Sequence, residues 1–297
     1  MNRIKDQIRC GAAYRLGLTG KGIGVAVLDT GIFLHRDFDS RVTGFADMVN
    51  GKTFAYDDCG NGTHICGIIG GSGRMSGGRY SGIAPGCDLV MVKVLDRKGN
   101  GYSSDVLAGI SWILERKEKL GIRILNISVG ACSKRGMSEN SALVKGVNRA
   151  WDAGLVVVVA AGNNGPRTMS ITTPGISRKV ITVGCSDDDR EVLVGGNRMV
   201  DYSGRGPTAA CICKPDLVAP GCSVVSCAGR ADKYTIKSGT SMSTPIVSGA
   251  TALLLERYPD MTNKDVKLKL RESCTDIGLP RNQQGWGLLD VEKLVSK

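Results

Sequence analysis

The fold of this chain is decided by the run Val25-Ala26-Val27-Leu28-Asp29-Thr30-Gly31, in which apolar residues rich in valine end in an acid and a glycine. An apolar run of this length that closes on a turn residue predicts a buried strand. Parallel strands of this kind present the polar residues that follow them at the carboxyl edge of the sheet, where α/β folds bind ligands. Asp29 is therefore a candidate catalytic carboxylate.

Other apolar runs alternate with amphipathic segments along the 297 residues. We expect further strands at Leu89–Leu95, Ile122–Ser128, Leu155–Ala160 and Val180–Val183, and helices at Asp105–Lys117, Asn140–Ala153, Ile246–Leu255 and Asp265–Ser273. Continuous Val/Ile/Leu strands separated by helices are typical of a parallel sheet covered on both faces. The sequence predicts an α/β fold, a three-layer α/β/α sandwich with a mostly parallel central sheet, in one domain.

A serine candidate lies in Lys237-Ser238-Gly239-Thr240-Ser241, directly before the apolar run at Ile246–Leu255. This position places Ser241 at a helix N-terminus, where free backbone N–H groups and the helix dipole favour an anion. A hydroxyl that attacks a carbonyl generates such an anion, so Ser241 is a candidate nucleophile. The alternative is that Gly-Thr-Ser only caps the helix, and an isolated motif favours that interpretation.

A side-chain amide follows the strand at Leu155–Ala160, where Ala161-Gly162-Asn163 ends the run. Asn163 can donate to an oxyanion. In this order, and with the glycine- and proline-rich segments 202–207, 214–221 and 285–290, the motifs resemble the subtilisin-like serine proteases (subtilases) from about Leu18 onward. The resemblance leaves residues 1–17 as an N-terminal extension of a single peptidase domain that spans residues 1–297.

The resemblance implies a serine endopeptidase that acts through an acyl-enzyme. Ser241 would attack the peptide bond, Asp29 would orient a histidine base, and Asn163 with the Ser241 backbone N–H would stabilise the oxyanion. The family's motif for the base is His-Gly-Thr-His, but here it reads Asn61-Gly62-Thr63-His64. Asn61 therefore stands at the base position, and His64 matches the second histidine.

An asparagine amide has no basic nitrogen, so Asn61 cannot accept the serine proton. In subtilisin, loss of the serine or the histidine lowers kcat about a million-fold, which is on the order of 8 kcal/mol of transition-state stabilisation. We expect hydrolysis by this chain to be strongly impaired. Three explanations stay open: a protease with one replaced residue, a pseudoprotease that binds peptides or proteins without cutting them, or a rescue in which His64 or a substrate histidine supplies the base.

The resemblance also assigns a substrate cleft. It implies that Ser128, Val129 and Gly130 form one wall and the segment Gly99-Asn100-Gly101-Tyr102 the other, so that an extended peptide or unfolded protein binds as an added strand. Ala161 and Gly162 would line the pocket for the residue before the scissile bond. A propeptide or proteinaceous inhibitor is a further possible partner of such a cleft.

The chemistry implied by the resemblance requires no cofactor. Asp37 matches a calcium ligand of the family, but the loop at 71–78 contributes Arg74 and no carboxylate, so we expect no calcium there. The pair Cys211 and Cys213 has no second Cys or His pair beside it, which favours a chance pair over a metal site. We therefore assign no metal-binding residues, and a structural calcium site elsewhere, formed by backbone oxygens, stays open.

The composition gives a formal net charge of +11 and eleven cysteines. Lysine and arginine clusters such as 116–119 and 264–269 are interrupted by acidic or apolar residues, which favours solvated helix faces over nucleic-acid binding. The odd number of cysteines without framework spacing favours reduced thiols. Since neither a signal peptide nor a membrane span is evident, we expect a cytoplasmic protein without membrane contact, similar to the short intracellular bacterial subtilases or to a trimmed mature domain.

Overall fold

A computed structural model describes residues 1–130 and 139–296. Its strands are β1 (Gly24–Asp29), β2 (Val42–Asp47), β3 (Asp88–Lys93), β4 (Ile122–Ile127), β5 (Val156–Ala160), β6 (Ile181–Cys185), β7 (Val192–Val194), β8 (Asn197–Met199), β9 (Leu217–Ala219), β10 (Val224–Cys227) and β11 (Tyr234–Lys237). Its helices are α1 (Asn2–Gln7), α2 (Gly11–Arg15), α3 (Asn61–Gly70), α4 (Ser103–Arg116), α5 (Ala142–Asp152), α6 (Thr240–Arg257), α7 (Asn263–Ser273), α8 (Arg281–Gln284) and α9 (Val291–Leu294), with a short 3-10 turn at Arg74–Ser76.

A seven-stranded sheet forms the middle of the molecule, in the order β2-β3-β1-β4-β5-β6-β9. Every neighbouring pair in this sheet is parallel. β1 lies inside it with all six residues buried, as its apolar sequence predicts. The parallel register brings the carboxyl ends of β1, β4 and β5 to one edge.

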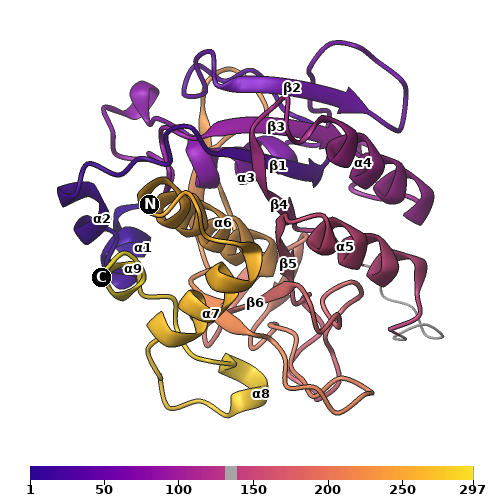
Figure 1. Ribbon diagram of the computed structural model, residues 1–297, viewed down its shortest axis with the longest axis vertical. Helices are drawn as coiled ribbons and strands as arrows, with labels where there is room; N and C mark the ends of the chain where they lie inside the picture. Colours follow the sequence, from indigo (N-terminus) through magenta and orange to yellow (C-terminus); the bar gives the residue numbers. More distant parts are fainter. Residues whose placement is uncertain (131–138, 297) are drawn as a thin grey trace.

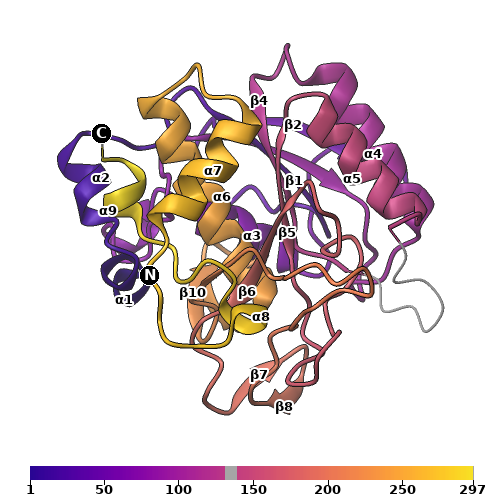
Figure 2. The same ribbon diagram turned by 60° about the horizontal axis from the view of Figure 1, so that its bottom comes forward.

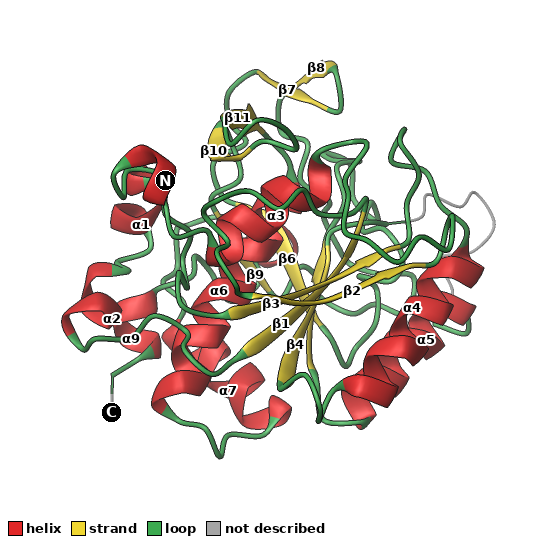
Figure 3. Cartoon of the chain, turned by 90° about the horizontal axis from the view of Figure 1, so that it is seen from above, coloured by secondary structure: helices red, strands yellow, loops and turns green. Residues whose placement is uncertain are grey.

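Helices cover both faces of the sheet. Figure 1 and Figure 3 show α3, α6 and α7 on one side and α4 and α5 on the other. The predicted three-layer α/β/α sandwich is thus confirmed. α6 is a largely enclosed helix: apart from Ser241, its residues from Thr240 to Leu255 are buried, which is typical of a central helix.

The first seventeen residues pack onto the rest of the chain. Ile4, Ile8 and Ala13 are buried, and the Val291 N–H donates to the Ile8 carbonyl at 2.8 Å. Figures 1 and 2 show the two chain ends on the same side of the molecule. The N-terminal segment therefore contributes side chains to the core and contacts the C-terminal helix.

Candidate active site

Asp29 ends β1, and its side chain is fully buried. Its Oδ1 accepts from the Thr30 N–H at 2.8 Å. Burial raises the pKa of Asp29 to about 6, because desolvation outweighs the hydrogen bonds that favour the charged form. The turn after Asp29 requires a glycine at position 31. Gly31 has a φ of +122°, and a Cβ there would lie 2.1 Å from the Tyr56 carbonyl oxygen.

A buried lysine holds the turn that follows Asp29. Lys93 Nζ donates to the carbonyls of Thr30 at 2.6 Å and Leu95 at 2.7 Å, and it pairs with Asp58 Oδ1 at 2.7 Å. Our sequence reading did not assign Lys93. Lys93 is the only charged residue in the apolar run Leu89–Leu95, and this could have identified it, because a lysine in a buried strand needs hydrogen-bond acceptors around it.

Asn61 begins α3, next to the carboxylate of Asp29. Its Nδ2 donates to Asp29 Oδ1 at 3.0 Å and to Oδ2 at 3.2 Å. Its Oδ1 accepts from Lys237 Nζ at 3.2 Å. The helix start is fixed by Asp57, whose side chain accepts from the Gly60 N–H at 2.7 Å and from the Thr63 N–H at 2.9 Å.

Ser241 is the second residue of α6 and faces the end of β4. Its Oγ donates to the Ser128 carbonyl oxygen at 2.8 Å. The helix begins after Gly239, which has a φ of +138° and whose N–H donates to the Gly221 carbonyl at 3.0 Å. Because a peptide carbonyl is not a useful base, this hydrogen bond orients the hydroxyl without removing its proton.

Asn163 lies in the same cleft as Ser241 and Asn61. Its Oδ1 accepts from both the Thr240 N–H and the Thr240 hydroxyl, each at 3.0 Å. The carbonyl end of the amide is therefore used within the protein, and the amide nitrogen is the end available to a ligand. Thr240 is a positioning residue that the sequence motif contained but that we had not assigned.

His64 is fully buried on α3 and points toward the hairpin of β10 and β11. Its Nε2 lies 3.1 Å from the Val224 carbonyl oxygen and 3.3 Å from that of Thr235, so this nitrogen carries the proton and donates. Burial lowers the pKa of His64 to about 3. The ring is consequently neutral and held by structural contacts.

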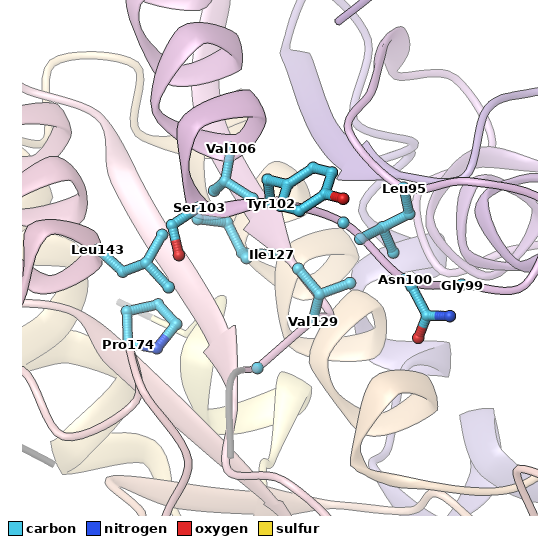
Figure 4. Close-up of a pocket in the computed structure, with 12 residues that line it drawn as sticks. Leu95, Gly99, Asn100, Tyr102, Ser103, Val106, Ile127, Val129, Leu143 and Pro174 are labelled. Atoms are coloured by element: carbon cyan, nitrogen blue, oxygen red, sulfur yellow. The ribbon is translucent and has the colours of Figure 1, made fainter. Parts of the chain in front are cut away.

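Two neighbouring cavities lie along the end of β4. Figure 4 shows the smaller one, of about 220 Å³, lined by Gly99, Gly101, Val129 and Gly130 among others. The larger cleft, of about 590 Å³, contains Asn61, Ser128, Asn163 and Ser241, and it shares Gly99, Val129 and Gly130 with the smaller cavity. The two predicted walls thus face common space beside the polar residues.

The two small residues after β5 are placed differently. Ala161 is fully buried in a cluster with Val144, Ile171 and Ile176. Gly162 has a φ of +91°, and a Cβ there would lie 2.4 Å from the Thr172 side chain. Among the described residues, neither Ala161 nor Gly162 belongs to the lining of these two cavities, so their role as pocket residues stays a prediction.

Asp37 has donors on both carboxylate oxygens. The Met75 N–H donates to Oδ1 at 2.9 Å, the Tyr234 hydroxyl to Oδ2 at 2.7 Å, and the Cys227 thiol to Oδ2 at 3.7 Å. Calcium prefers several oxygen ligands around one point. Protein donors bind this carboxylate and Arg74 adds positive charge in the neighbouring loop, and our expectation of no calcium at Asp37 stays a prediction.

A serine at the start of a buried helix, a carboxylate and an amide donor at one sheet edge define the arrangement of a serine hydrolase on an α/β scaffold. The comparison with known sequences gives the family. Residues 20–287 match the Subtilase family (Peptidase_S8), and the chain belongs to this family. The resemblance carried by the sequence motifs is confirmed.

Individual relatives agree with this placement. Serine protease AprX from Bacillus subtilis (strain 168) is 42% identical over 292 residues, which cover 93% of this chain and 65% of that protein. Subtilisin BL from Lederbergia lenta is 34% identical over 287 residues, covering 97% of this chain and 96% of the relative. Among solved structures, Sphericase superposes with a TM-score of 0.79 at 31% identity, covering 92% of this chain and 93% of the other. The chain spans about two thirds of the length of AprX and nearly the whole of Subtilisin BL, and both relatives support a subtilisin-like serine protease scaffold.

Proposed function

We propose that the chain is a subtilisin-type serine endopeptidase in which Asn61 occupies the position of the general base, so that peptide hydrolysis is strongly impaired. Ser241 is the nucleophile, Asp29 is the acid that would orient a histidine, and Asn163 with the Ser241 N–H donates to the oxyanion. Extended peptides or unfolded proteins are the substrates of the cleft.

One observation carries this proposal: the Asn61 amide donates to both oxygens of Asp29, at 3.0 and 3.2 Å. In a serine protease the group that contacts the buried acid is the imidazole, which takes the serine proton with its other nitrogen. An amide reproduces the contact to the acid but has no nitrogen lone pair for the proton. Asn61 therefore keeps the local geometry while leaving Ser241 without a base.

The test is the replacement Asn61→His, assayed for hydrolysis of a chromogenic peptide beside the unchanged chain. We expect kcat to rise by about 10³-fold or more, since the base contributes through Ser241 and the oxyanion donors remain. Asn61→Gln is the matched control, because it retains the amide and should stay at the starting rate. Addition of Ser241→Ala to the histidine variant should abolish the gain. A histidine variant no faster than its parent would show that Asn61 is not at the base position.

The second candidate function is peptide or protein binding without cleavage. It is favoured by the cleft of about 590 Å³, which holds Ser241 and Asn163 and is bordered by the end of β4. Fluorescence anisotropy with a labelled peptide tests it: micromolar or tighter binding by the unchanged chain, without cleavage over the same period, would support a binding role. Equal affinity in the Ser241→Ala variant would separate binding from residual chemistry.

We infer the cellular location of this protein from its thiols. The cysteines of the described residues are free, which agrees with the reducing cytoplasm that we infer as the location. Over the described residues, no helix combines the length and apolar character needed to cross a bilayer. We infer no cofactor for the chemistry and no calcium at Asp37, because the neighbouring loop at 71–78 contributes Arg74 and no carboxylate.

A further inference from the structure

Two cysteines, an aspartate and a tyrosine meet outside the catalytic cleft. Cys185 ends β6 and Asp187 follows it, while Tyr202 precedes β9 and Cys222 follows that strand. Their exposed fractions are 1% for Cys185, 6% for Asp187 and 0% for both Tyr202 and Cys222. The ligand atoms of Cys185, Asp187 and Cys222 all lie within 4.8 Å of one another. This cluster could not be recognised in the sequence, because its members come from three separate segments.

The distances between these atoms resemble the edges of a tetrahedral metal site. Cys185 Sγ lies 3.3 Å from Asp187 Oδ1 and 3.2 Å from the Tyr202 hydroxyl oxygen, which is 3.1 Å from Cys222 Sγ. Zinc bonds of about 2.3 Å to sulfur and about 2.1 Å to oxygen give sulfur–oxygen edges of about 3.6 Å at tetrahedral angles. The three distances lie within about 0.5 Å of this edge, and the ligand atoms of Cys185, Asp187 and Cys222 stay within 4.8 Å of one another, so side-chain adjustment in place would bring the four ligand atoms around one ion.

We propose that Cys185, Asp187, Cys222 and Tyr202 form a structural site for a thiophilic divalent cation, with zinc as the expected ion. On binding, the two thiols release their protons to solvent and two metal–sulfur bonds form. Asp187 Oδ1, which accepts the Cys185 thiol, binds the ion in place of that hydrogen. The Tyr202 hydroxyl stays protonated and offers an oxygen lone pair as the fourth ligand.

The surroundings of the cluster suit such an ion. Arg3 donates to Asp187 Oδ2 at 2.8 Å and to the Cys222 carbonyl at 2.6 Å, which leaves Asp187 Oδ1 turned toward the sulfurs. Two thiolates and one carboxylate carry three negative charges, and these are balanced by the divalent ion and the Arg3 guanidinium. The N–H groups of Gly221 and Cys222 also donate to Oδ1, at 2.7 and 3.0 Å, and fix the carboxylate further.

A second buried cluster in the described part of the chain provides an internal comparison. His35, Asp37 and Cys227 also bring three ligand atoms together. There the His35 Nδ1 lone pair already accepts from the Asp37 N–H at 3.1 Å, and Nε2 lies 3.1 Å from the Lys233 carbonyl. A cation would have to break a backbone hydrogen bond, and only one thiol is present. The cluster of Cys185 and Cys222 is the better fit for a thiophilic ion.

The site would connect the core to the turn before the serine. Cys222 follows Gly221, whose carbonyl accepts from the Gly239 N–H at 3.0 Å, and Gly239 caps α6. A Cβ at Gly221 would lie 2.9 Å from Cys185 Sγ and 2.4 Å from Ser243 Oγ, so these segments are in close contact. A bound ion would therefore link the end of β6 to the segment at Gly221, which contacts the N-cap of α6.

The experiment uses the full chain carrying Cys59→Ser, Cys211→Ser and Cys213→Ser, which removes the exposed thiols among the described residues. This parent is produced in cells grown with added zinc, since a buried site fills during folding, and its metal content is measured by elemental analysis. We expect about one zinc per chain, and a Tm about 4 °C or more above that of the same chain stripped with a chelator.

Three single variants of the parent locate the ion. Cys185→Ser and Cys222→Ser should each lower the zinc content at least tenfold, whereas Cys227→Ser, in the comparison cluster, should leave it unchanged. Production with cobalt gives a second readout, because two thiolate ligands produce an intense ultraviolet charge-transfer band and tetrahedral cobalt absorbs in the visible. Because the cobalt spectrum is recorded on the parent, it tests the proposal even if a serine variant fails to fold. Zinc at background level in the parent, zinc unchanged by both Cys185→Ser and Cys222→Ser, or cobalt without thiolate bands would each overturn the proposal.

Discussion

The amide nitrogen of Asn61 lies within hydrogen-bond distance of both carboxylate oxygens of Asp29, at 3.0 and 3.2 Å. On its other side the amide oxygen accepts from Lys237 at 3.2 Å. A chain of acid, amide and ammonium thus crosses the cleft. These hydrogen bonds connect the three groups, yet none of them removes a proton from Ser241, which donates to a backbone carbonyl instead.

The buried charge of Asp29 predicts a pH-dependent stability. Its folded-state pKa of about 6 lies above the usual value of 3.8, so the folded chain holds the proton more tightly than the unfolded chain. The resulting stabilisation is complete below pH 3.8 and is lost as the pH rises through 6, by up to about 3 kcal/mol. Asp29→Asn, which is neutral at every pH, should therefore gain stability relative to its parent between pH 4 and pH 8. Urea unfolding at both pH values measures this difference, with the exposed Asp260→Asn as a control that should show none.

The amide of Asn163 predicts a loss confined to the chemical step. In the Asn61→His background, Asn163→Ala should lower kcat by about 10²- to 10³-fold with little change in KM, because the donor acts on charge that develops in the transition state. Asn163→Asp is the sharper variant, since it keeps an acceptor for Thr240 while removing the N–H donors. A variant Asn163→Asp that retained full kcat would show that the amide is only a structural acceptor.

The contacts of His64 predict that this residue acts on stability and not on hydrolysis. His64→Leu should lower the free energy of unfolding by about 1–3 kcal/mol, because the carbonyls of Val224 and Thr235 lose their donor. In the Asn61→His background, the rate per folded molecule should not change. Ile65→Val is a neighbouring control with an expected cost of about 0.5–1.5 kcal/mol. A large fall in the residual rate of the Asn61 chain on loss of His64 would instead support a role as substitute base.

The donors around Asp37 predict stability that is independent of calcium at this position. Any shift in Tm on addition of calcium should be the same in Asp37→Ala as in the unchanged chain. Asp37→Ala should also lower the free energy of unfolding by about 1–3 kcal/mol, because the Tyr234 hydroxyl and the Met75 N–H lose their acceptor. Calorimetry with and without added calcium makes the measurement. A calcium-dependent rise in Tm that Asp37→Ala abolished would contradict this expectation.

Much of the fold could be predicted because its buried strands are continuous apolar runs. β1, β4 and β5 agree with their runs to within a few residues, and the α6 helix extends its predicted core in both directions. β2 and β9 were missed for physical reasons. β2 (Val42–Asp47) is mostly half-buried and contains a glycine and an acid, and β9 (Leu217–Ala219) has only three residues, too few for a period to be recognised.

The site was predicted only in part, because sequence motifs name residues and not their partners. Asp29, Asn61, Asn163 and Ser241 were each assigned, and the structure brings them to one edge of the sheet. The contact of Lys237 with Asn61 could not be read from the sequence, since it depends on where β11 ends. The full burial of Ala161 likewise depends on how the loop around Thr172 folds over it.

The position of Asn61 has a genetic consequence. Codons for asparagine and histidine differ only in their first base, so a single transversion separates this side chain from an imidazole. The helix start, the carboxylate beside it and the serine across the cleft would all be inherited unchanged. A gene for this chain therefore stands one nucleotide away from the histidine form, and one base change in either direction would switch the proposed base without rebuilding the fold.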